Sequence, residues 1–332
     1  MPVVTAFSVV SADTVRAILD ADLPGVVDLV ERTYLRHDAG GTVNPPSYFL
    51  RFPDDPAARI IALPAALDGE PGVAGLKWIS SFPDNLDRGL PRASAVLVLN
   101  DRRTGFPTAC VEASVISATR TAASAALAAR ALAGSARRVG FVGAGLIAAR
   151  IAEFLAAVGI PAERVLLHDH NPDRAARLAE RVDRAEVART AEEAVRESDL
   201  VVFATTAGTP HVTDADWLAH RPVVLHISLR DLSPQIVLGA TNVVDDVEHC
   251  LQANTSPHLA EQLTGNRDHV HATLADVLTG RFTPPGDRPV VFSPFGLGVL
   301  DLALAEVVHG RALAEGTATV IPSFFSGLHP DR

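Results

Sequence analysis

The sequence predicts an α/β protein in which a doubly wound parallel sheet is joined to a second, α+β domain. Between residues 118 and 310, short apolar runs rich in β-branched residues alternate with segments of helical periodicity. These runs are apolar throughout, which is typical of parallel strands covered by helices on both faces. The first hundred residues instead contain strand-like runs separated by Gly, Pro and Asp, which indicates a separate α+β domain.

The composition limits the classes of function. The chain has 332 residues, 48% of them hydrophobic, which is enough for two domains with cores of their own. The net charge is -10 without any basic run, so a nucleic-acid surface is not expected, although a local Arg/Lys pocket can still hold a small anion. Cys110 and Cys250 lack disulfide or zinc spacing, and neither a signal peptide nor a membrane-length apolar stretch is evident. We expect a cytoplasmic protein with no metal and no membrane contact.

The elements of the parallel sheet can be placed in order. Its expected strands lie at 139–145, 164–169, 185–189, 200–206 and 222–229. Gly159 is a suitable stop for the first helix, Pro172 lies in the first turn of the second, and "TAEE" at 190–193 has the capping-box pattern. The apolar helix at 297–316 is expected to close this domain.

The first domain is expected to contain three strand-like stretches, at 58–67, 73–82 and 93–113, the last with a hairpin turn at "NDRRTG". The Ala-rich segment 114–134 predicts a helix that crosses between the domains. The predicted boundaries are 1–117, completed by 311–332, for the α+β domain and 118–310 for the parallel sheet.

"GAGLIA" fits the G-x-G-x-x-G/A dinucleotide fingerprint through Gly143, Gly145 and Ala148, and makes the parallel sheet Rossmann-type. The first glycine permits the tight turn, the second lets the backbone approach a pyrophosphate, and the small third residue allows close packing. Asp169 at the end of the next strand can hold both ribose hydroxyls and would repel a 2′-phosphate, which favours NAD over NADP. A tight turn without a ligand is the alternative.

Neighbouring residues weaken the predicted preference for NAD over NADP and extend the expected cofactor site. His168, His170 and Arg174 are cations or potential cations that can instead accommodate a phosphate. Thr205 and Thr206 lie at the carboxyl end of another strand, where open sheets bind ligands, so we expect them at the cofactor site. They can also simply end the strand.

Lys77 is the single lysine among 29 basic residues. Arginine ends in a planar guanidinium that stays charged, whereas the ammonium of lysine is compact and can lose its proton when buried. A site that needs a compact ammonium would retain a lysine, while an arginine-rich composition would leave one by chance.

Other charged residues are candidates for the chemistry. Arg51, Arg92 and Arg120 lie in the first domain or at its junction and can act as carboxylate clamps. Asp231, in "HISLRD", ends a strand of the sheet. Each of these residues can also be a surface charge or part of a structural salt bridge.

Asp301 is either a second active-site acid or a helix N-terminal charge. The stretch 245–271 is rich in His and acids but lacks regular ligand spacing, and is interpreted as a solvated loop.

Over nearly its whole length the sequence resembles the ornithine cyclodeaminase/mu-crystallin family. The resemblance rests on "GLKWISSFPDN", "LPRASAVLVLND", "SATRTAASAALAARALAG", "GFVGAGLIA", "HDHNP", "SLRD" and "FGLGVLDLALAE". It implies a homodimer whose N-terminal domain provides the dimer contact and the substrate pocket. It also implies that Arg51 and Arg120 bind the substrate carboxylate, that Lys77 is the active-site lysine and that Asp231 is the catalytic aspartate.

The chain departs from ornithine cyclodeaminases, because "SLRD" replaces a "GAD"-like stretch and no acid near "ALPAALD" matches the one that holds ornithine's terminal amine. It looks more like the 2,3-diaminopropionate branch of the family. Those enzymes use NAD to oxidise N-(2-amino-2-carboxyethyl)-L-glutamate, releasing 2-oxoglutarate and L-2,3-diaminopropionate for siderophores or peptide antibiotics. The extra cations Arg92 and Arg230 suit a small anionic substrate with three carboxylates.

Two other functions stay open. One is an ornithine cyclodeaminase or a ketimine reductase. The other is a non-catalytic, mu-crystallin-like protein that binds a nucleotide and a small ligand. Retention of Lys77 and Asp231 argues against a protein that only binds, because binding alone does not require a base.

Overall fold

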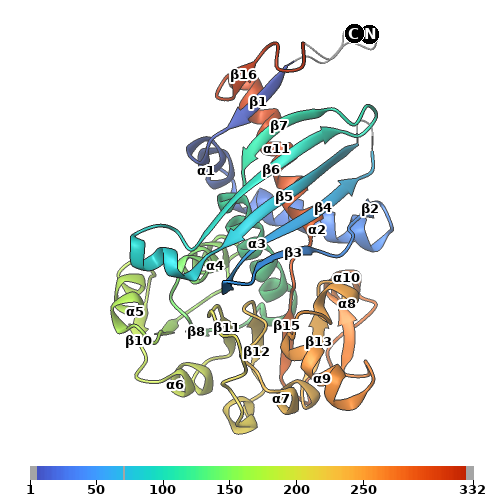
Figure 1. The fold of residues 1–332 in the computed structure, drawn as a ribbon. Helices are drawn as coiled ribbons and strands as arrows, with labels where there is room; N and C mark the ends of the chain where they lie inside the picture. The colour runs from blue at the N-terminus through green and yellow to red at the C-terminus, as the bar shows by residue number, and fades with distance from the viewer. Residues whose placement is uncertain (1–5, 70–71, 327–332) are drawn as a thin grey trace. The chain divides into compact units, whose positions relative to one another are not determined.

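A computed structural model describes residues 6–69 and 72–326 (Figure 1). The chain divides into two compact units. Unit 1 comprises Met1–Arg120 and Leu297–Arg332, and unit 2 comprises Thr121–Gly296. Each unit is built around a sheet of its own, and the predicted α/β class with a Rossmann-type parallel sheet is confirmed.

Unit 1 is an α+β structure. Its strands are β1 (Phe7–Val10), β2 (Thr42–Val43), β3 (Tyr48–Phe52), β4 (Asp55–Leu67), β5 (Val73–Ser81), β6 (Ala93–Asp101), β7 (Pro107–Glu112) and β16 (Thr319–Ile321). Its helices are α1 (Ala12–Asp20), α2 (Leu23–Asp38), the short 3-10 helix η1 (Pro83–Arg88), the start of α3 (Ser114–Ala133) and α11 (Gly298–Ala314).

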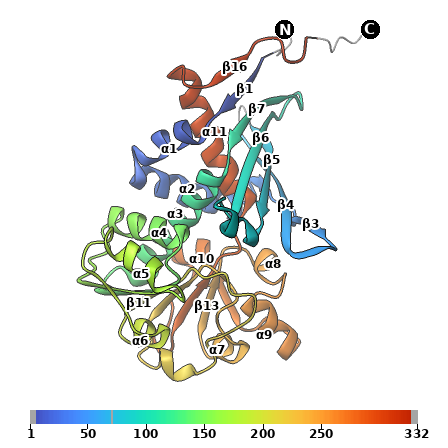
Figure 2. The same cartoon turned by 60° about the vertical axis from the view of Figure 1, so that its left-hand side comes forward.

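The sheet of unit 1 has the strand order β16-β1-β7-β6-β5-β4-β2, with β3 also paired to β4. Strands β4 to β7 are antiparallel neighbours, and Leu63, Lys77 and Leu97 form one cross-strand row. This row lies on the buried face, against which α11 packs. Figure 2 shows α1, α2 and α11 on one side of the sheet, and no helix of the described part of unit 1 on the other.

The predicted boundary at residue 310 is wrong. Helix α11 belongs to unit 1, where it packs on α2, β4 and β5, and does not close the parallel sheet. The reason is that α11 is buried almost all round, from Gly298 to Ala305, so its sequence pattern does not indicate which sheet it covers.

Unit 2 alternates strands with helices. Its strands are β8 (Arg138–Val142), β9 (Arg164–His168), β10 (Ala185–Val187), β11 (Leu200–Phe203), β12 (Val223–His226), β13 (Thr241–Val244), β14 (Val270–Thr273) and β15 (Val290–Ser293). Its helices after α3 are α4 (Leu146–Ala157), α5 (Pro172–Ala179), α6 (Ala191–Arg196), η2 (Ala215–Leu218), α7 (Pro234–Leu238), α8 (Val247–Cys250), α9 (Ser256–Thr264) and α10 (Leu274–Leu278).

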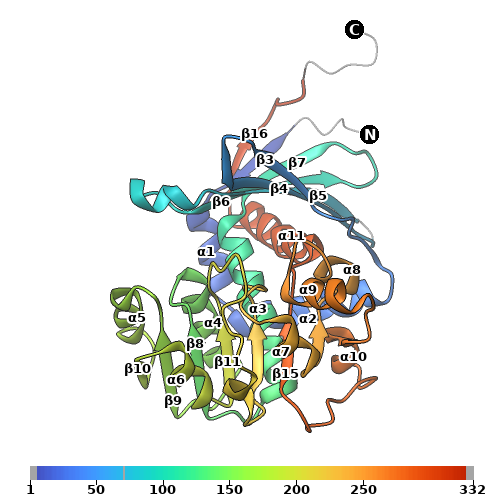
Figure 3. The same ribbon diagram turned by 60° about the horizontal axis from the view of Figure 1, so that its bottom comes forward.

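All pairings in the unit 2 sheet are parallel, in the order β10-β9-β8-β11-β12-β15-β13-β14, part of which Figure 3 shows. The chain runs outward from β8 through β9 to β10 and then returns to the other side of β8 with β11. The strand order therefore reverses between β8 and β11. Ligands of open parallel sheets bind at such a switch point, beyond the carboxyl ends of the strands.

Within residues 6–69 and 72–326, no helix is both long and apolar enough to cross a membrane.

Candidate active site

The turn from β8 into α4 requires glycine at its first position. Gly143 has a φ of 96°, and a Cβ there would lie 2.5 Å from the carbonyl oxygen of Ala204. Its N–H donates to the carbonyl of His168 at 2.8 Å. The turn is thereby held between the ends of the two strands that flank β8.

The N-terminus of α4 is open to a ligand. Gly145 is its N-cap residue, makes no side-chain cap and would have no atom within 4 Å of an added Cβ. The first N–H groups of the helix thus lack a side-chain acceptor and carry the positive end of the helix dipole, which suits a phosphate. Ala148, at the third fingerprint position, is fully buried, as close packing of helix and strand requires.

Asp169 follows β9 and supports the glycine turn. Its Oδ2 accepts from the N–H of Ala144 and its Oδ1 from the N–H of Asn171, both at 2.8 Å. Each carboxylate oxygen has a second lone pair and can also accept from a ribose hydroxyl. The glycine turn, the uncapped helix and this carboxylate together fit a dinucleotide.

Asp231 lies in the turn after β12 and is 0% exposed. Its carboxylate accepts hydrogen bonds from the hydroxyls of Thr205 and Ser228 and from His211 Nε2, the last at 3.0 Å. Burial raises the pKa of Asp231, but its contacts with His211, His226 and Ser228 outweigh burial and hold it well below its ordinary value. Asp231 is therefore a fixed anion at neutral pH.

His226, at the end of β12, also contacts Asp231. Its Nε2 accepts from the backbone N–H of Asp231 at 3.1 Å and also lies 3.2 Å from the Asp231 carboxylate. Its Nδ1 faces Ser293 Oγ at 3.3 Å. The His226 ring thus contacts both the backbone and the carboxylate of Asp231 and positions the turn that carries them.

The two threonines predicted at the cofactor site differ in their surroundings. Thr205 donates to Asp231 and accepts from the N–H of Ala207 at 3.1 Å, so its hydroxyl belongs to the Asp231 cluster. Thr206 is exposed. Both follow β11, next to the switch point.

In unit 1, Lys77 is buried in an ion-pair cluster. Its Nζ lies 2.6 Å from Asp301 Oδ2 and 3.4 Å from Ser117 Oγ. The other Asp301 oxygen accepts from Arg120 Nε at 3.3 Å. The Lys77 side chain is 2% exposed and that of Asp301 0%. Asp301, for which the sequence left two roles open, is thus the partner of both cations.

The pKa of Lys77 is lowered to about 8. Burial is the main cause, because it disfavours the charged ammonium; Asp301 opposes the shift and the positive charge of Arg120 adds to it. An amine in this range can exchange a proton near neutral pH, which a guanidinium cannot do.

Close packing of α11 on β5 places Asp301 beside Lys77. Gly75 lies on the same face of β5 as Lys77, and a Cβ there would be 2.7 Å from Leu302 Cδ1 and 2.5 Å from the carbonyl of Val98. The absence of a side chain at Gly75 lets α11 approach the sheet, so the residue before Leu302 reaches the buried lysine.

The predicted carboxylate clamps share that face of the sheet. Arg51 pairs in register with Arg59, and Arg59 with Ser81, four residues along β5 from Lys77. Arg92 donates to Ser81 Oγ at 2.9 Å, and burial lowers its pKa. Arg51, which is exposed, thus lies in the cross-strand row that contains Ser81, and the Arg92 side chain contacts that row at Ser81, about 13 Å along the strand from Lys77.

Arg230 lies in unit 2, where its Nη2 donates to the carbonyl of Ala253 at 2.8 Å. It shares a turn with Asp231, and its guanidinium fixes the loop that precedes α9. The structure gives Arg230 a structural contact, and its predicted role as a substrate ligand stays a prediction.

The stretch 245–271 is not the solvated loop that we expected. Asp245, His249 and His269 are buried, and Asp245 accepts from the N–H groups of Phe295 and Gly296 at 2.9 and 2.6 Å. Within the described part of the chain, no cluster of three or more His, Cys, Asp or Glu side chains is arranged to hold a metal.

Sequence reasoning missed His211. It lies in the loop after β11, and an isolated histidine in a loop carries no sequence pattern. Only the fold brings it to Asp231, 20 residues further along the chain.

Comparison with known proteins identifies relatives over most of the chain. The model of the ornithine cyclodeaminase/mu-crystallin family matches residues 9–316. N-((2S)-2-amino-2-carboxyethyl)-L-glutamate dehydrogenase of Staphylococcus aureus is 31% identical over 89% of this chain and 92% of its own length.

Two solved structures share the fold. Thermococcus litoralis Delta(1)-pyrroline-2-carboxylate reductase, in complex with NADH and L-proline, has a TM-score of 0.86 and 26% identity, covering 94% of this chain and 99% of its own. An archaeal alanine dehydrogenase dimer with bound NAD has a TM-score of 0.85 and 29% identity, covering 95% and 99% of the two chains.

Proposed function

The chain belongs to the ornithine cyclodeaminase/mu-crystallin family, and from that premise we propose that it oxidatively cleaves N-(2-amino-2-carboxyethyl)-L-glutamate. The products would be 2-oxoglutarate and L-2,3-diaminopropionate, the latter a building block for a siderophore or peptide natural product. At a coarser level the chain is an NAD-dependent dehydrogenase or reductase of this family.

The observation that carries the proposal is that the candidate cations of unit 1 fall into two groups. Lys77 and Arg120 share the buried carboxylate of Asp301, whereas the exposed Arg51 and the half-buried Arg92 lie near Ser81, four residues along β5 from Lys77. Cations spaced along a strand match a substrate with carboxylates at both ends. L-Alanine and L-proline have one carboxylate each and would leave the second group of cations without a substrate partner.

The residues that would hold NAD are Gly143 and Gly145 at the pyrophosphate and Asp169 at the adenosine ribose, with Ala148 allowing the helix to pack close to the strand. NAD supplies the hydride acceptor for oxidation of the substrate's C–N bond. Because the Asp169 carboxylate would repel a 2′-phosphate, NADP should bind at least ten times more weakly, a difference of about 1.4 kcal/mol.

Lys77 and the Asp231 cluster are the groups we propose for the chemistry. Lys77 would bind a substrate carboxylate as an ammonium and, with its lowered pKa, hold or release a proton near the reacting carbon. The fixed negative charge of Asp231 would orient the groups that donate to it and stabilise positive charge that develops beside it.

The uncovered face of the unit 1 sheet supports a homodimer. Tyr48, Ala62, Trp78 and Val96 form one cross-strand row on the face opposite Lys77. Tyr48, Trp78 and Val96 are 68%, 39% and 41% exposed. A row of large apolar side chains on an uncovered sheet favours an interface, and we propose a second copy as its partner.

The test is NADH formation, followed by absorbance, when the protein and NAD are mixed with each candidate substrate. We expect stoichiometric NADH, 2-oxoglutarate and diaminopropionate from N-(2-amino-2-carboxyethyl)-L-glutamate, and far slower NADPH formation when NADP replaces NAD. Turnover of L-alanine or L-proline in its place would make the chain a different dehydrogenase or reductase. Cyclisation of ornithine without net NADH would identify a cyclodeaminase, and binding without turnover of any substrate would identify a binding protein.

A further inference from the structure

Asp231 is not accessible to solvent. The whole residue is 0% exposed, and three side chains donate to its carboxylate. Its pKa lies well below the ordinary value, so it accepts a proton with difficulty. Burial and pKa together argue against Asp231 as the group that exchanges protons with water.

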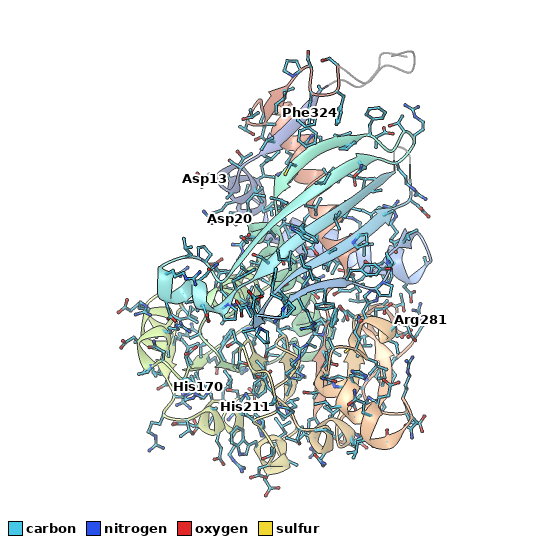
Figure 4. The ribbon with its side chains drawn as sticks, viewed as in Figure 1. Asp13, Asp20, His170, His211, Arg281 and Phe324 are labelled. Atoms are coloured by element: carbon cyan, nitrogen blue, oxygen red, sulfur yellow. The ribbon has the colours of Figure 1, made fainter. Side chains whose placement is uncertain are left out.

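His211 is the most exposed member of this cluster, whereas Thr205 and Ser228 are half-buried. Its side chain is 34% exposed, whereas the carboxylate to which it is bonded is not exposed at all. It lies in unit 2, where Figure 4 labels it, in the loop that follows β11. This loop follows a strand that borders the switch point of the sheet.

The backbone and side-chain contacts of His211 fix its orientation. The N–H groups of His211 and Val212 both donate to the carbonyl of Asp231, at 3.0 and 2.8 Å. The His211 ring also packs edge-on against Phe203, with ring centroids 6.4 Å apart. The ring is thereby held against Asp231 without a ligand.

The contact with Asp231 also fixes the tautomer. An ionised carboxylate only accepts, so His211 Nε2 must carry the proton that it donates. Neutral His211 then has its lone pair on Nδ1, for which residues 6–69 and 72–326 provide no hydrogen-bond partner. A histidine whose proton on one nitrogen is held by a buried carboxylate, with the other nitrogen unoccupied, is arranged as a general base.

We propose that His211 is the catalytic proton carrier of the hydrolytic half-reaction and that Asp231 is its positioning residue. This rests on the proposed function. The oxidised substrate is a protonated imine. Water adds to its carbon, a water proton passes to Nδ1, and the C=N electron pair moves to nitrogen. Nδ1 then returns the proton to that nitrogen as the C–N bond breaks, and the hydroxyl proton is released as the carbonyl forms.

The first test needs no substrate. In protein labelled with ¹⁵N-histidine, long-range ¹H–¹⁵N correlation spectra distinguish the two ring nitrogens, and His211→Gln identifies the resonances. We expect neutral His211 to be protonated on Nε2, and Asp231→Asn to change its tautomer populations. A neutral His211 protonated on Nδ1, or a tautomer that Asp231→Asn leaves unaltered, would overturn the proposal.

The second test is chemical rescue. Turnover of His211→Ala should fall at least a hundredfold and recover in part with added imidazole, because the 34% exposed site admits a small base. Asp231→Asn should lose turnover without recovery, because imidazole does not replace the positioning carboxylate. His220→Ala is the matched control: His220 is another surface-reaching histidine of unit 2, bonded to the carbonyl of Ser198, and its loss should be neutral.

The two tests distinguish the possible failures. Near-normal turnover of His211→Ala, or lost turnover that imidazole does not restore, overturns the role of His211. If the wild-type protein does not turn over the tricarboxylate substrate, the proposed function fails, and the tautomer measurement still decides whether His211 is arranged as a base.

Discussion

The chemistry at the scale of single residues depends on how burial changes ordinary side chains. Lys77 was recognisable from its rarity and Asp231 from its place at the end of a strand. Their surroundings were not predictable. Asp301 pairs with Lys77 across 224 positions of sequence, and His211 approaches Asp231 only once β11 and β12 are side by side.

We expect Lys77→Arg to lower kcat/KM at least a hundredfold, close to 3 kcal/mol in transition-state free energy, although the positive charge is kept. The 2% exposed site is shaped around an ammonium 2.6 Å from Asp301, and a planar guanidinium is larger and keeps its proton. NADH formation measures the loss, and circular dichroism checks that the variant folds. Arg102→Lys, at an exposed ion pair with Asp68, is the control. Near-normal activity of Lys77→Arg would make the single lysine an accident of composition.

Burial of Lys77 also predicts how the free energy of unfolding depends on pH. Well below pH 8 the Lys77 amine is protonated in both the folded and the unfolded protein. Folding then carries the full free-energy cost of burying this charge. Between about 8 and the ordinary 10.5 the folded state has lost this proton while the unfolded state keeps it, so the contribution of Lys77 to stability rises with pH. The total change is on the order of 3 kcal/mol.

Urea unfolding from pH 7.5 to 10.5, compared with Lys77→Met, isolates this contribution, because other titrating groups cancel in the difference. The wild type should gain stability relative to the variant as pH rises. Two curves that stay parallel would show that Lys77 has an ordinary pKa.

At the scale of elements, the strands β8 to β12 and the helices α4 to α6 of unit 2 followed from their apolar runs and caps, whereas β13 to β15, α7 to α10 and several features of unit 1 did not. The short strands β2, β3 and β16 have partly exposed, mixed sequences, so no hydrophobic period marks them. The position of α11 depends on which sheet has room for it, and a helix that is apolar on all sides does not reveal this.

The approach of α11 to β5 can be tested at Gly75. Gly75→Ala should lower the free energy of unfolding by about 1–3 kcal/mol, because its Cβ would overlap Leu302 and the carbonyl of Val98. It should also lower turnover, since Asp301 moves with the helix. The control is Gly310→Ala in helix α11, where no atom lies within 4 Å of the new Cβ. This substitution should leave the free energy of unfolding unchanged or raise it by about 0.5–1 kcal/mol. Equal effects of the two substitutions on urea unfolding would exclude close packing at Gly75 as the cause.

At the scale of the whole molecule, the proposed homodimer can be tested by measuring the molar mass of the protein in solution. Light scattering should give twice the 35.0 kDa of the chain for the wild type. Trp78→Glu should shift the mass toward that of one chain, because it places a charge in the exposed apolar row of the unit 1 sheet. Leu263→Glu is the control, since Leu263 is 58% exposed on α9 of unit 2. A Trp78→Glu dimer as stable as the wild type would place the interface elsewhere.

A single lysine in a central strand of the unit 1 sheet makes limited proteolysis a test of whether that sheet is intact. Endoproteinase Lys-C cuts after lysine, and its one target bond here, between Lys77 and Trp78, lies within β5, paired with β4 on one side and β6 on the other. A protease needs an extended, unpaired segment around the bond that it cuts, and fraying at an end of the strand does not provide one. The native protein should therefore resist Lys-C. Cleavage in an opened unit 1 sheet should yield just two fragments, residues 1–77 and 78–332, and the rate at which they appear on a gel should report the open population.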